Sequence, residues 1–189
     1  MYERILQAAL RVLREEGALG FTTSRVAEEA DVSVGSLYQY FPNKHALVLA
    51  VHEAEMRAGW EHIQSILDQP RWSARRKLHE IAEWFFLKEA DDASSYGAVT
   101  GDIEVFLRTG GAAVDAALIS AAVARFASFL EGASDERRTA RDLEFTTRFV
   151  MTTVESVGKS VAAQQLTKRE TVAWARRTAT MLADHVGLP

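Results

Sequence analysis

Apolar residues recur every three or four positions through most of the chain, which is the spacing of helices that bury one face. Ile5, Leu6, Ala9 and Leu13 begin this pattern and predict a helix over residues 2–16, with Gly17 as its stop. The polar residues 90–100 predict a loop. Further helices are expected at about residues 44–67, 73–89, 101–108, 112–131, 135–165 and 167–187. With two short helices inside residues 22–41, the pattern predicts an all-α fold of about nine helices.

The stretch from Phe21 to His45 predicts two short helices that meet at a tight turn. Thr22 and Thr23 stand where the first helix starts, and Ser33 is a good N-cap for the second. Residues 30–32 form the turn, and Asn43 can cap the helix that opens at Lys44. This arrangement is a helix-turn-helix, whose second helix enters the DNA major groove, although an ordinary pair of helices has the same periodicity.

Hydroxyl-bearing side chains favour the DNA-binding interpretation. They crowd around the second short helix, together with Arg25 and Lys44, and such groups donate hydrogen bonds to phosphate oxygens. A purely structural pair of helices does not need so many of them on one side. The hydroxyl-bearing residues are Thr22, Thr23, Ser24, Ser33, Ser36, Tyr38 and Tyr40.

The same residues resemble the DNA-binding domain of the tetracycline-repressor (TetR) family of bacterial transcriptional regulators. The resemblance lies in residues 5–10 (ILQAAL), 15–33 and 34–47, with the run GSLYQYF followed by Asn43-Lys44 as its most specific part. It covers about a quarter of the chain. Asp31 stands where the family usually has glycine, and Asp tolerates a left-handed backbone better than most residues. The resemblance implies a DNA-binding domain over residues 1–46 and a helical effector-binding and dimerisation domain over residues 47–189.

Residue roles follow from the family pattern. Val34, Gly35 and Ser36 are expected at the groove, where glycine lets the backbone approach and valine can pack on a thymine methyl. Tyr38, Tyr40, Thr22 or Thr23, and Lys44 are expected on phosphates; Arg25 either joins them or pairs with Glu28 or Glu29. No Arg, Lys or Asn stands at the tip, so specificity should depend on methyl contacts and DNA shape. The predicted DNA contacts are Thr22, Thr23, Arg25, Val34, Gly35, Ser36, Tyr38, Tyr40 and Lys44.

The last two predicted helices each carry an apolar seam that could pair with a second copy of the chain. In the family these helices form the dimer interface. A two-fold dimer presents two DNA-binding helices, called reading heads below, to a palindromic operator. The alternative is that both seams belong to the core of one chain. The predicted interface residues are Val150, Val154, Val157, Val161, Val172, Ala175, Ala179 and Leu182.

Aromatic residues of the second domain could line a ligand pocket, as the resemblance implies. Aromatic residues at helical spacing are more often solid core, so a filled interior is the alternative. An apolar or aromatic effector of unknown identity fits the candidate lining best. Without a pocket, the protein would be a regulator controlled by a protein partner. The candidates are Trp60, Ile63, Phe85, Phe106, Phe126, Phe145 and Phe149.

Composition excludes other classes of protein. The 189 residues include no Cys, and the five His show no metal-ligand spacing, so neither thiol chemistry nor a metal or other cofactor is expected. The absence of a phosphate-binding glycine loop and of a Gly-x-Ser-x-Gly elbow argues against an enzyme. No apolar run is long enough for a membrane span, so the chain is expected to be soluble and cytoplasmic. The net charge is −4, and residues 1–46 hold five basic and six acidic residues. DNA affinity per monomer should therefore be modest, which makes dimerisation important.

Overall fold

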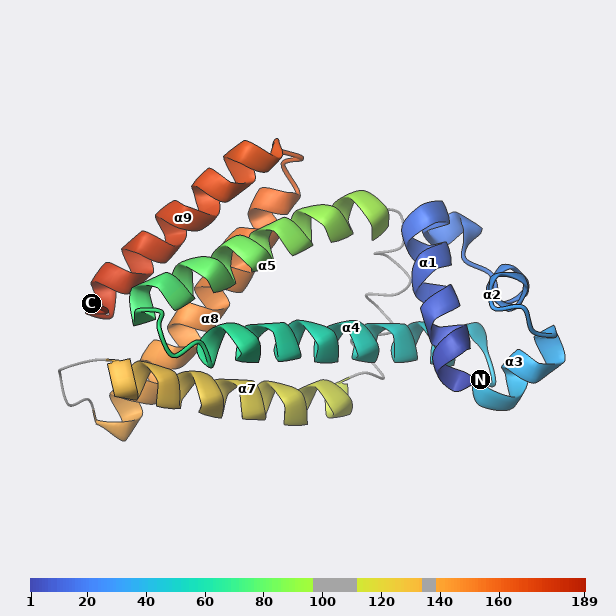
Figure 1. Cartoon of the computed structure of the whole chain (residues 1–189), viewed down its shortest axis with the longest axis horizontal. Helices are drawn as coiled ribbons and strands as arrows, with labels where there is room; N and C mark the ends of the chain where they lie inside the picture. The colour runs from blue at the N-terminus through green and yellow to red at the C-terminus, as the bar shows by residue number, and fades with distance from the viewer. Residues whose placement is uncertain (97–111, 134–138) are drawn as a thin grey trace. The chain divides into compact units, whose positions relative to one another are not determined.

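The computed structural model describes residues 1–96, 112–133 and 139–189, and within them all regular structure is helical (Figure 1). This confirms the predicted all-α fold, with eight helices in the described residues. They are α1 (Tyr2–Gly20), α2 (Thr23–Glu29), α3 (Val34–Tyr40), α4 (Lys44–Leu67), α5 (Ala74–Tyr96), α7 (Ala112–Ala133), α8 (Ala140–Ala162) and α9 (Lys168–His185). The helix predicted over residues 101–108 lies outside the described part. None of the helices that are described is long and apolar enough to cross a membrane.

Side-chain caps set several helix starts where the sequence predicts them. Ser33 Oγ accepts the Ser36 amide at 3.0 Å, and Asn43 Oδ1 accepts the Ala46 amide at 2.8 Å. Ser73 does the same for α5, and Thr167 with Glu170 forms the predicted capping box of α9. Each bond satisfies an amide that has no partner within its own helix.

Three helix boundaries differ from the prediction. α1 continues to Gly20, although Gly17 interrupts it with a backbone φ of 65°. α5 extends through the predicted loop at residue 90 as far as Tyr96, and the ion pair between Lys88 and Asp92, one turn apart, supports this extension. α8 begins at Ala140 rather than near residue 135, because Thr139 caps it. Residues 135 and 136 themselves lie outside the description.

The chain forms two compact units. Unit 1 contains Met1–Gly59 and Ser94–Ala117, and unit 2 contains Trp60–Ala93 and Leu118–Pro189. In unit 1, α1 to α3 and the start of α4 enclose a core centred on residues such as Ile5, Phe21, Leu37 and Leu47. In unit 2, the core joins α5, α7, α8 and α9 through residues such as Leu78, Phe86, Leu130, Val150 and Ala179. Each unit therefore buries its own apolar cluster.

Candidate nucleic-acid interface and effector region

The predicted helix-turn-helix consists of α2, a short turn and α3. Asp31 in the turn has a φ of 51°, the left-handed conformation that glycine adopts most easily. The Val32 amide donates to the Ala27 carbonyl at 3.0 Å and closes the turn. Aspartate thus keeps the turn that the family usually makes with glycine.

α3 is anchored by its buried face and presents the opposite face to solvent. Leu37 and Phe41 are buried in the core of unit 1. Val34 and Tyr38 remain 37% and 46% exposed, although both are large and apolar in part. The predicted groove residues therefore lie together at the exposed start of α3.

Nothing in the described part of the chain requires glycine at position 35. A Cβ built at this position would meet only Ser33 Oγ, at 3.7 Å, which is an ordinary contact. Its φ does not lie in the left-handed region. Glycine lowers helix stability relative to alanine, so its presence here points to something outside the chain that approaches the backbone closely.

The structure brings together hydroxyl groups from both helices of the motif. Thr23 Oγ1 lies 3.2 Å from Tyr38 Oη, which links the start of α2 to α3. Ser33 Oγ and Ser36 Oγ are 2.9 Å apart at the tip of α3. Thr22 accepts the Arg25 amide at 3.1 Å. These hydroxyls form a polar rim around the exposed start of α3.

Lys44 and Tyr40 complete this surface. Lys44 Nζ lies 5.6 Å from the centre of the buried Phe21 ring, and no carboxylate pairs with it among the described residues. Tyr40 is exposed, and its ring lies 6.5 Å from that of Tyr2 at the start of α1. Lys44 is therefore available to an anion.

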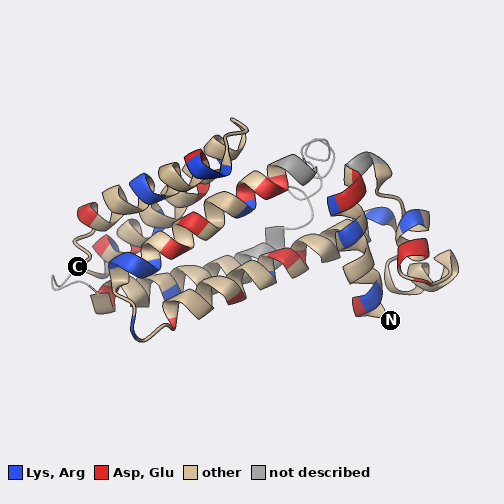
Figure 2. Cartoon of the chain, turned by 45° about the horizontal axis from the view of Figure 1, so that its top comes forward, with Lys and Arg blue, Asp and Glu red and all other residues tan. Residues whose placement is uncertain are grey.

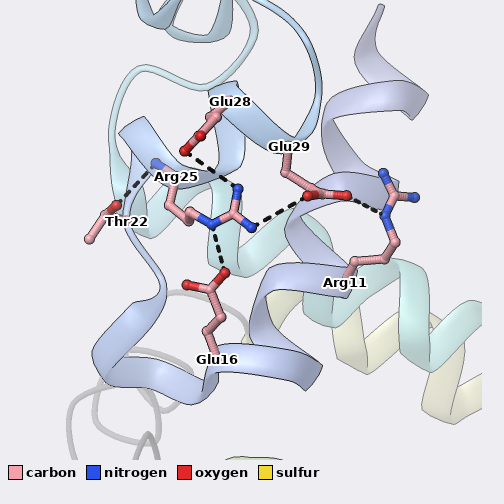
Figure 3. Close-up of polar contacts among 6 residues, drawn as sticks. All are labelled: Arg11, Glu16, Thr22, Arg25, Glu28 and Glu29. Atoms are coloured by element: carbon pink, nitrogen blue, oxygen red, sulfur yellow. Dashed lines mark hydrogen bonds and ion pairs between the residues drawn. The ribbon is translucent and has the colours of Figure 1, made fainter.

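Arg25, in contrast, is surrounded by carboxylates (Figure 3). Its Nε lies 2.6 Å from Glu16, and its terminal nitrogens lie 3.5 Å from Glu28 and from Glu29. The hydrogen bond to Glu16 raises the pKa of Arg25 further above its usual range. Pairing with Glu28 and Glu29 was the predicted alternative to phosphate contact, and it is the one found. Glu16 was missed, because nothing in the spacing shows that the end of α1 folds back onto α2.

Basic and acidic residues are interspersed along α1 and α2 rather than gathered by sign (Figure 2). Arg11 pairs with Glu29 at 2.9 Å, and Arg14 pairs with Glu55 at 3.0 Å. Much of the positive charge of unit 1 is therefore balanced within the protein. Electrostatic attraction to a polyanion would be local, as the sequence predicts.

The predicted pocket residues do not share one environment. Phe126 is buried, and Trp60, Ile63 and Phe85 are half-buried; Phe106 lies outside the described residues. Phe145 and Phe149, however, are 69% and 41% exposed. Neither lines the interior of one chain, because α8 turns its other face inward.

The predicted dimer seam is core within one chain. Val157 and Val172 are half-buried, whereas six of the eight predicted residues are buried against other helices of unit 2. These six need correction as interface residues, since no second copy can reach a side chain that its own chain covers. They are Val150, Val154, Val161, Ala175, Ala179 and Leu182.

The large exposed residues of α8 and α9 form a different apolar surface, which we call the exposed α8–α9 face: Phe145, Phe149, Trp174 and Met181. The Phe145 and Phe149 rings stack with centres 6.2 Å apart. Phe149 also lies 5.5 Å from the His185 ring, so the two exposed stripes are neighbours. Exposed apolar residues gathered in this way mark an interaction surface.

Comparison with known sequences identifies the family. Residues 5–51 match the sequence profile of the bacterial regulatory proteins of the tetR family. Residues 5–51 therefore form a TetR-family segment. The matched segment holds α1, α2, α3 and the start of α4, which are the elements of the candidate interface. The matched family is one of regulatory proteins rather than enzymes.

Individual relatives are similar to part of the chain. The transcriptional repressor KstR of Mycolicibacterium smegmatis is 48% identical over 50 residues, which are 26% of this chain and 24% of that protein. The HTH-type regulator YvdT of Bacillus subtilis is 33% identical over 90 residues, 47% of this chain and 45% of that protein. The chain thus spans less than half the length of these curated relatives.

The whole TetR-family fold extends beyond the matched segment. The crystal structure of the transcriptional regulator FadR from Bacillus subtilis, in complex with stearoyl-CoA, superposes with a TM-score of 0.69. The superposition covers 96% of this chain and 97% of that one, at 21% sequence identity. The two proteins therefore share a fold in both units.

Proposed function

We propose that this protein is a DNA-binding transcriptional repressor, which binds a palindromic operator as a homodimer and is released by a small apolar or aromatic effector. The observation that carries DNA binding is the start of α3. Val34 is exposed there, and Gly35 leaves room that none of the residues the structure describes fills. Family membership supports the same function for this surface.

Roles on DNA follow from the surface chemistry. Val34 packs on a thymine methyl, Gly35 lets the backbone approach, and Ser36 bonds a base edge or a phosphate. Tyr38, Tyr40, Thr22, Thr23 and Lys44 contact phosphates. The start of α4 adds backbone amides and the positive end of its dipole. Since no bidentate side chain reaches the groove, DNA shape contributes much of the specificity.

Selection of bound duplexes from a random pool, with the full chain, tests this function. We expect a palindromic sequence to be enriched. Tyr38→Phe and Lys44→Ala should weaken binding about equally for the selected and an unrelated duplex, and Lys44→Ala should lower the salt slope by about one. Val34→Ala should change the preferred sequence. A pool without enrichment would exclude operator binding, and altered preference in Lys44→Ala would contradict the division of roles.

A homodimer would bring two reading heads to one operator. The exposed α8–α9 face supports this assembly, since four large apolar side chains remain uncovered in a single chain. A two-fold axis beside these helices would bury Phe145, Phe149, Trp174 and Met181 against their copies. This face replaces the seam that the periodicity alone suggests.

An effector would act through unit 2 and α4. α4 begins at Lys44 in unit 1 and ends at Leu67 in unit 2, so movement in unit 2 can reach the reading head along one helix. Glu89 offers a polar group on α5, one helical turn after the half-buried Phe85. Burial raises the pKa of Glu89, while Lys159 and Lys88 lower it. Perturbed carboxylates of this kind gather at binding sites.

Native mass spectrometry of the purified protein, followed by thermal shift with stearoyl-CoA and palmitate, tests for an effector. FadR of Bacillus subtilis holds stearoyl-CoA, which makes an acyl chain the first probe. An effector that raises the melting temperature should weaken operator binding, and the operator should weaken effector binding by the same factor. Failure of every apolar probe would favour control by a protein partner, the alternative function.

A further inference from the structure

Four charged residues of α1 and α2 form a continuous chain of ion pairs, which we call the α1–α2 charge chain: Glu16, Arg25, Glu29 and Arg11. Glu16 Oε1 lies 2.6 Å from Arg25 Nε, and Arg25 NH2 lies 3.5 Å from Glu29 Oε2. The other oxygen of Glu29 accepts Arg11 Nε at 2.9 Å. Negative and positive side chains alternate in this series. It connects α2 to α1 at two points, through Glu16 with Arg25 and through Arg11 with Glu29 (Figure 3).

The bond between Glu16 and Arg25 spans the interruption in α1. Glu16 is the last residue before Gly17, whose φ of 65° breaks the helix, and Arg25 stands in the first turn of α2. The backbone at Gly20 lies against Glu16, since a Cβ at Gly20 would be 2.5 Å from Glu16 Cβ. Glu16 is therefore held in place both by the backbone at Gly20 and by its ion pair with Arg25.

The same arrangement keeps Arg25 from serving as a phosphate contact. Its guanidinium extends toward Glu16, Glu28 and Glu29 rather than toward Thr22 (Figure 3). Moving it to a phosphate would break its bond to Glu16 and leave Glu16, whose side chain is only 33% exposed, without its counter-charge, while Glu29 would keep Arg11 alone. The carboxylates around it would also repel the phosphate.

Arg25 is instead connected to the hydroxyl groups that face DNA in the proposed function. Its backbone amide donates to Thr22 Oγ1 at 3.1 Å and so fixes the cap of α2. The next residue, Thr23, bonds Tyr38 on α3 at 3.2 Å. The position of Arg25 thus sets where two predicted phosphate contacts lie.

We propose that Arg25 and Glu16 are positioning residues for operator binding: their ion pair holds the start of α2 against α1 so that Thr22 and Thr23 meet the DNA backbone, while Arg25 itself touches no phosphate. This inference rests on the proposed DNA-binding function. It adds Glu16, an acidic residue, to the residues that DNA binding requires.

Operator affinity of charge-neutralised variants tests the inference, measured by fluorescence anisotropy well below each melting temperature. Arg25→Gln and Glu16→Gln should each weaken binding about fivefold, and the double variant should be no weaker than either alone. The slope of log Kd against log salt should stay at the wild-type value in Arg25→Gln. Lys44→Ala, a phosphate contact, should lower that slope by about one.

Glu15→Gln is the matched control. It removes the same charge one residue away, from an exposed side chain with no ion pair among the described residues. It should bind at least as tightly as the wild type, because a negative charge near DNA is lost. Amide signals of Thr22 and Thr23 in a nitrogen-15 NMR spectrum should shift in Arg25→Gln and Glu16→Gln but not in Glu15→Gln.

Three results would overturn the inference. A lower salt slope in Arg25→Gln would make Arg25 a phosphate contact. Tighter operator binding by Glu16→Gln than by Glu15→Gln would show that Glu16 only keeps Arg25 away from the DNA. Wild-type affinity in both single variants, whatever their melting temperatures, would limit the ion pair to stability. If the wild type itself bound no duplex, the proposed function would fail, and this inference would fail with it.

Discussion

At the residue scale, the exposed start of α3 combines features that cost stability without serving the fold. Val34 leaves apolar surface in water, and Gly35 stands in a helical turn where alanine would fit. Leu37 and Phe41, on the other face, are buried and hold the helix. The two faces of α3 therefore separate folding from contact with an external partner, and they can be tested separately.

Gly35→Ala should uncouple stability from DNA binding. We expect the free energy of unfolding to rise by about 0.5–1 kcal/mol, because alanine loses less backbone entropy than glycine and meets no clash here. Operator binding should weaken by roughly tenfold, since the methyl group separates the backbone from the groove. Urea denaturation and fluorescence anisotropy measure the two effects.

Gly132→Ala in α7 is the control for this substitution. A Cβ added at Gly132 meets no described atom within 4 Å, and one added at Gly35 meets only an ordinary contact, so Gly132→Ala should gain stability in the same way and leave DNA binding unchanged. Equal operator affinity in wild type and Gly35→Ala would remove the close backbone approach from the proposed recognition.

At the element scale, helix starts were predictable, whereas the buried face of a helix was not. Ser33, Asn43, Ser73 and Thr167 cap the helices expected, because a cap and its amide lie within three residues of each other. α8, however, carries apolar residues on two faces, and its partners come from distant segments. Phe145, expected to line a pocket, is therefore exposed, and Val150, expected at a dimer interface, is buried within one chain.

The contact between α5 and α8 depends on a residue with no side chain. A Cβ added to Gly158 would lie 3.0 Å from two atoms of the Phe85 ring and 3.2 Å from Phe86. Gly158→Ala should gain about 1 kcal/mol of helix propensity but lose about 1–3 kcal/mol to overpacking. The net effect should be a lower free energy of unfolding, measured by urea denaturation.

Phe85→Leu in the Gly158→Ala background should recover part of that loss, because the shorter side chain removes the clash. A double-mutant cycle would then give a favourable coupling between the two substitutions. If Gly158→Ala alone stabilised the protein, the Phe85 ring would have to move aside at little cost, and close packing would not explain the glycine.

At the scale of the whole molecule, two units with separate cores share continuous helices, and α4 is the one that starts at the reading head. The family profile matches residues 5–51 alone, yet the fold of FadR superposes on nearly the whole chain. Unit 2 therefore shares its fold with FadR at low overall sequence identity, and a shared fold does not fix a function.

Met181→Glu and Phe145→Glu should convert a dimer into monomers without unfolding the chain. Both side chains are largely exposed in one chain, at 72% and 69%, so a charge there costs little unless a partner covers it. Sedimentation velocity should show half the mass of the wild-type dimer. Operator affinity should fall by roughly two orders of magnitude or more, because avidity is lost.

Ile119→Glu in α7 is the matched substitution away from this face, since Ile119 is also exposed. It should leave the mass and the operator affinity unchanged. A Met181→Glu protein that sediments like the wild type would show that the exposed α8–α9 face does not hold the assembly together.

The sequence by itself determined the features that depend on neighbours within about four positions: the all-α class, the caps, the turn at Asp31 and the exposed start of α3. The family signature in residues 5–51 lies in the same local elements. Tertiary structure alone decided which stripe of α8 faces the core, and that Glu16 binds Arg25 across the interruption at Gly17. Both features depend on which distant segments pack together, because burial stabilises any apolar face that packs against a complementary surface.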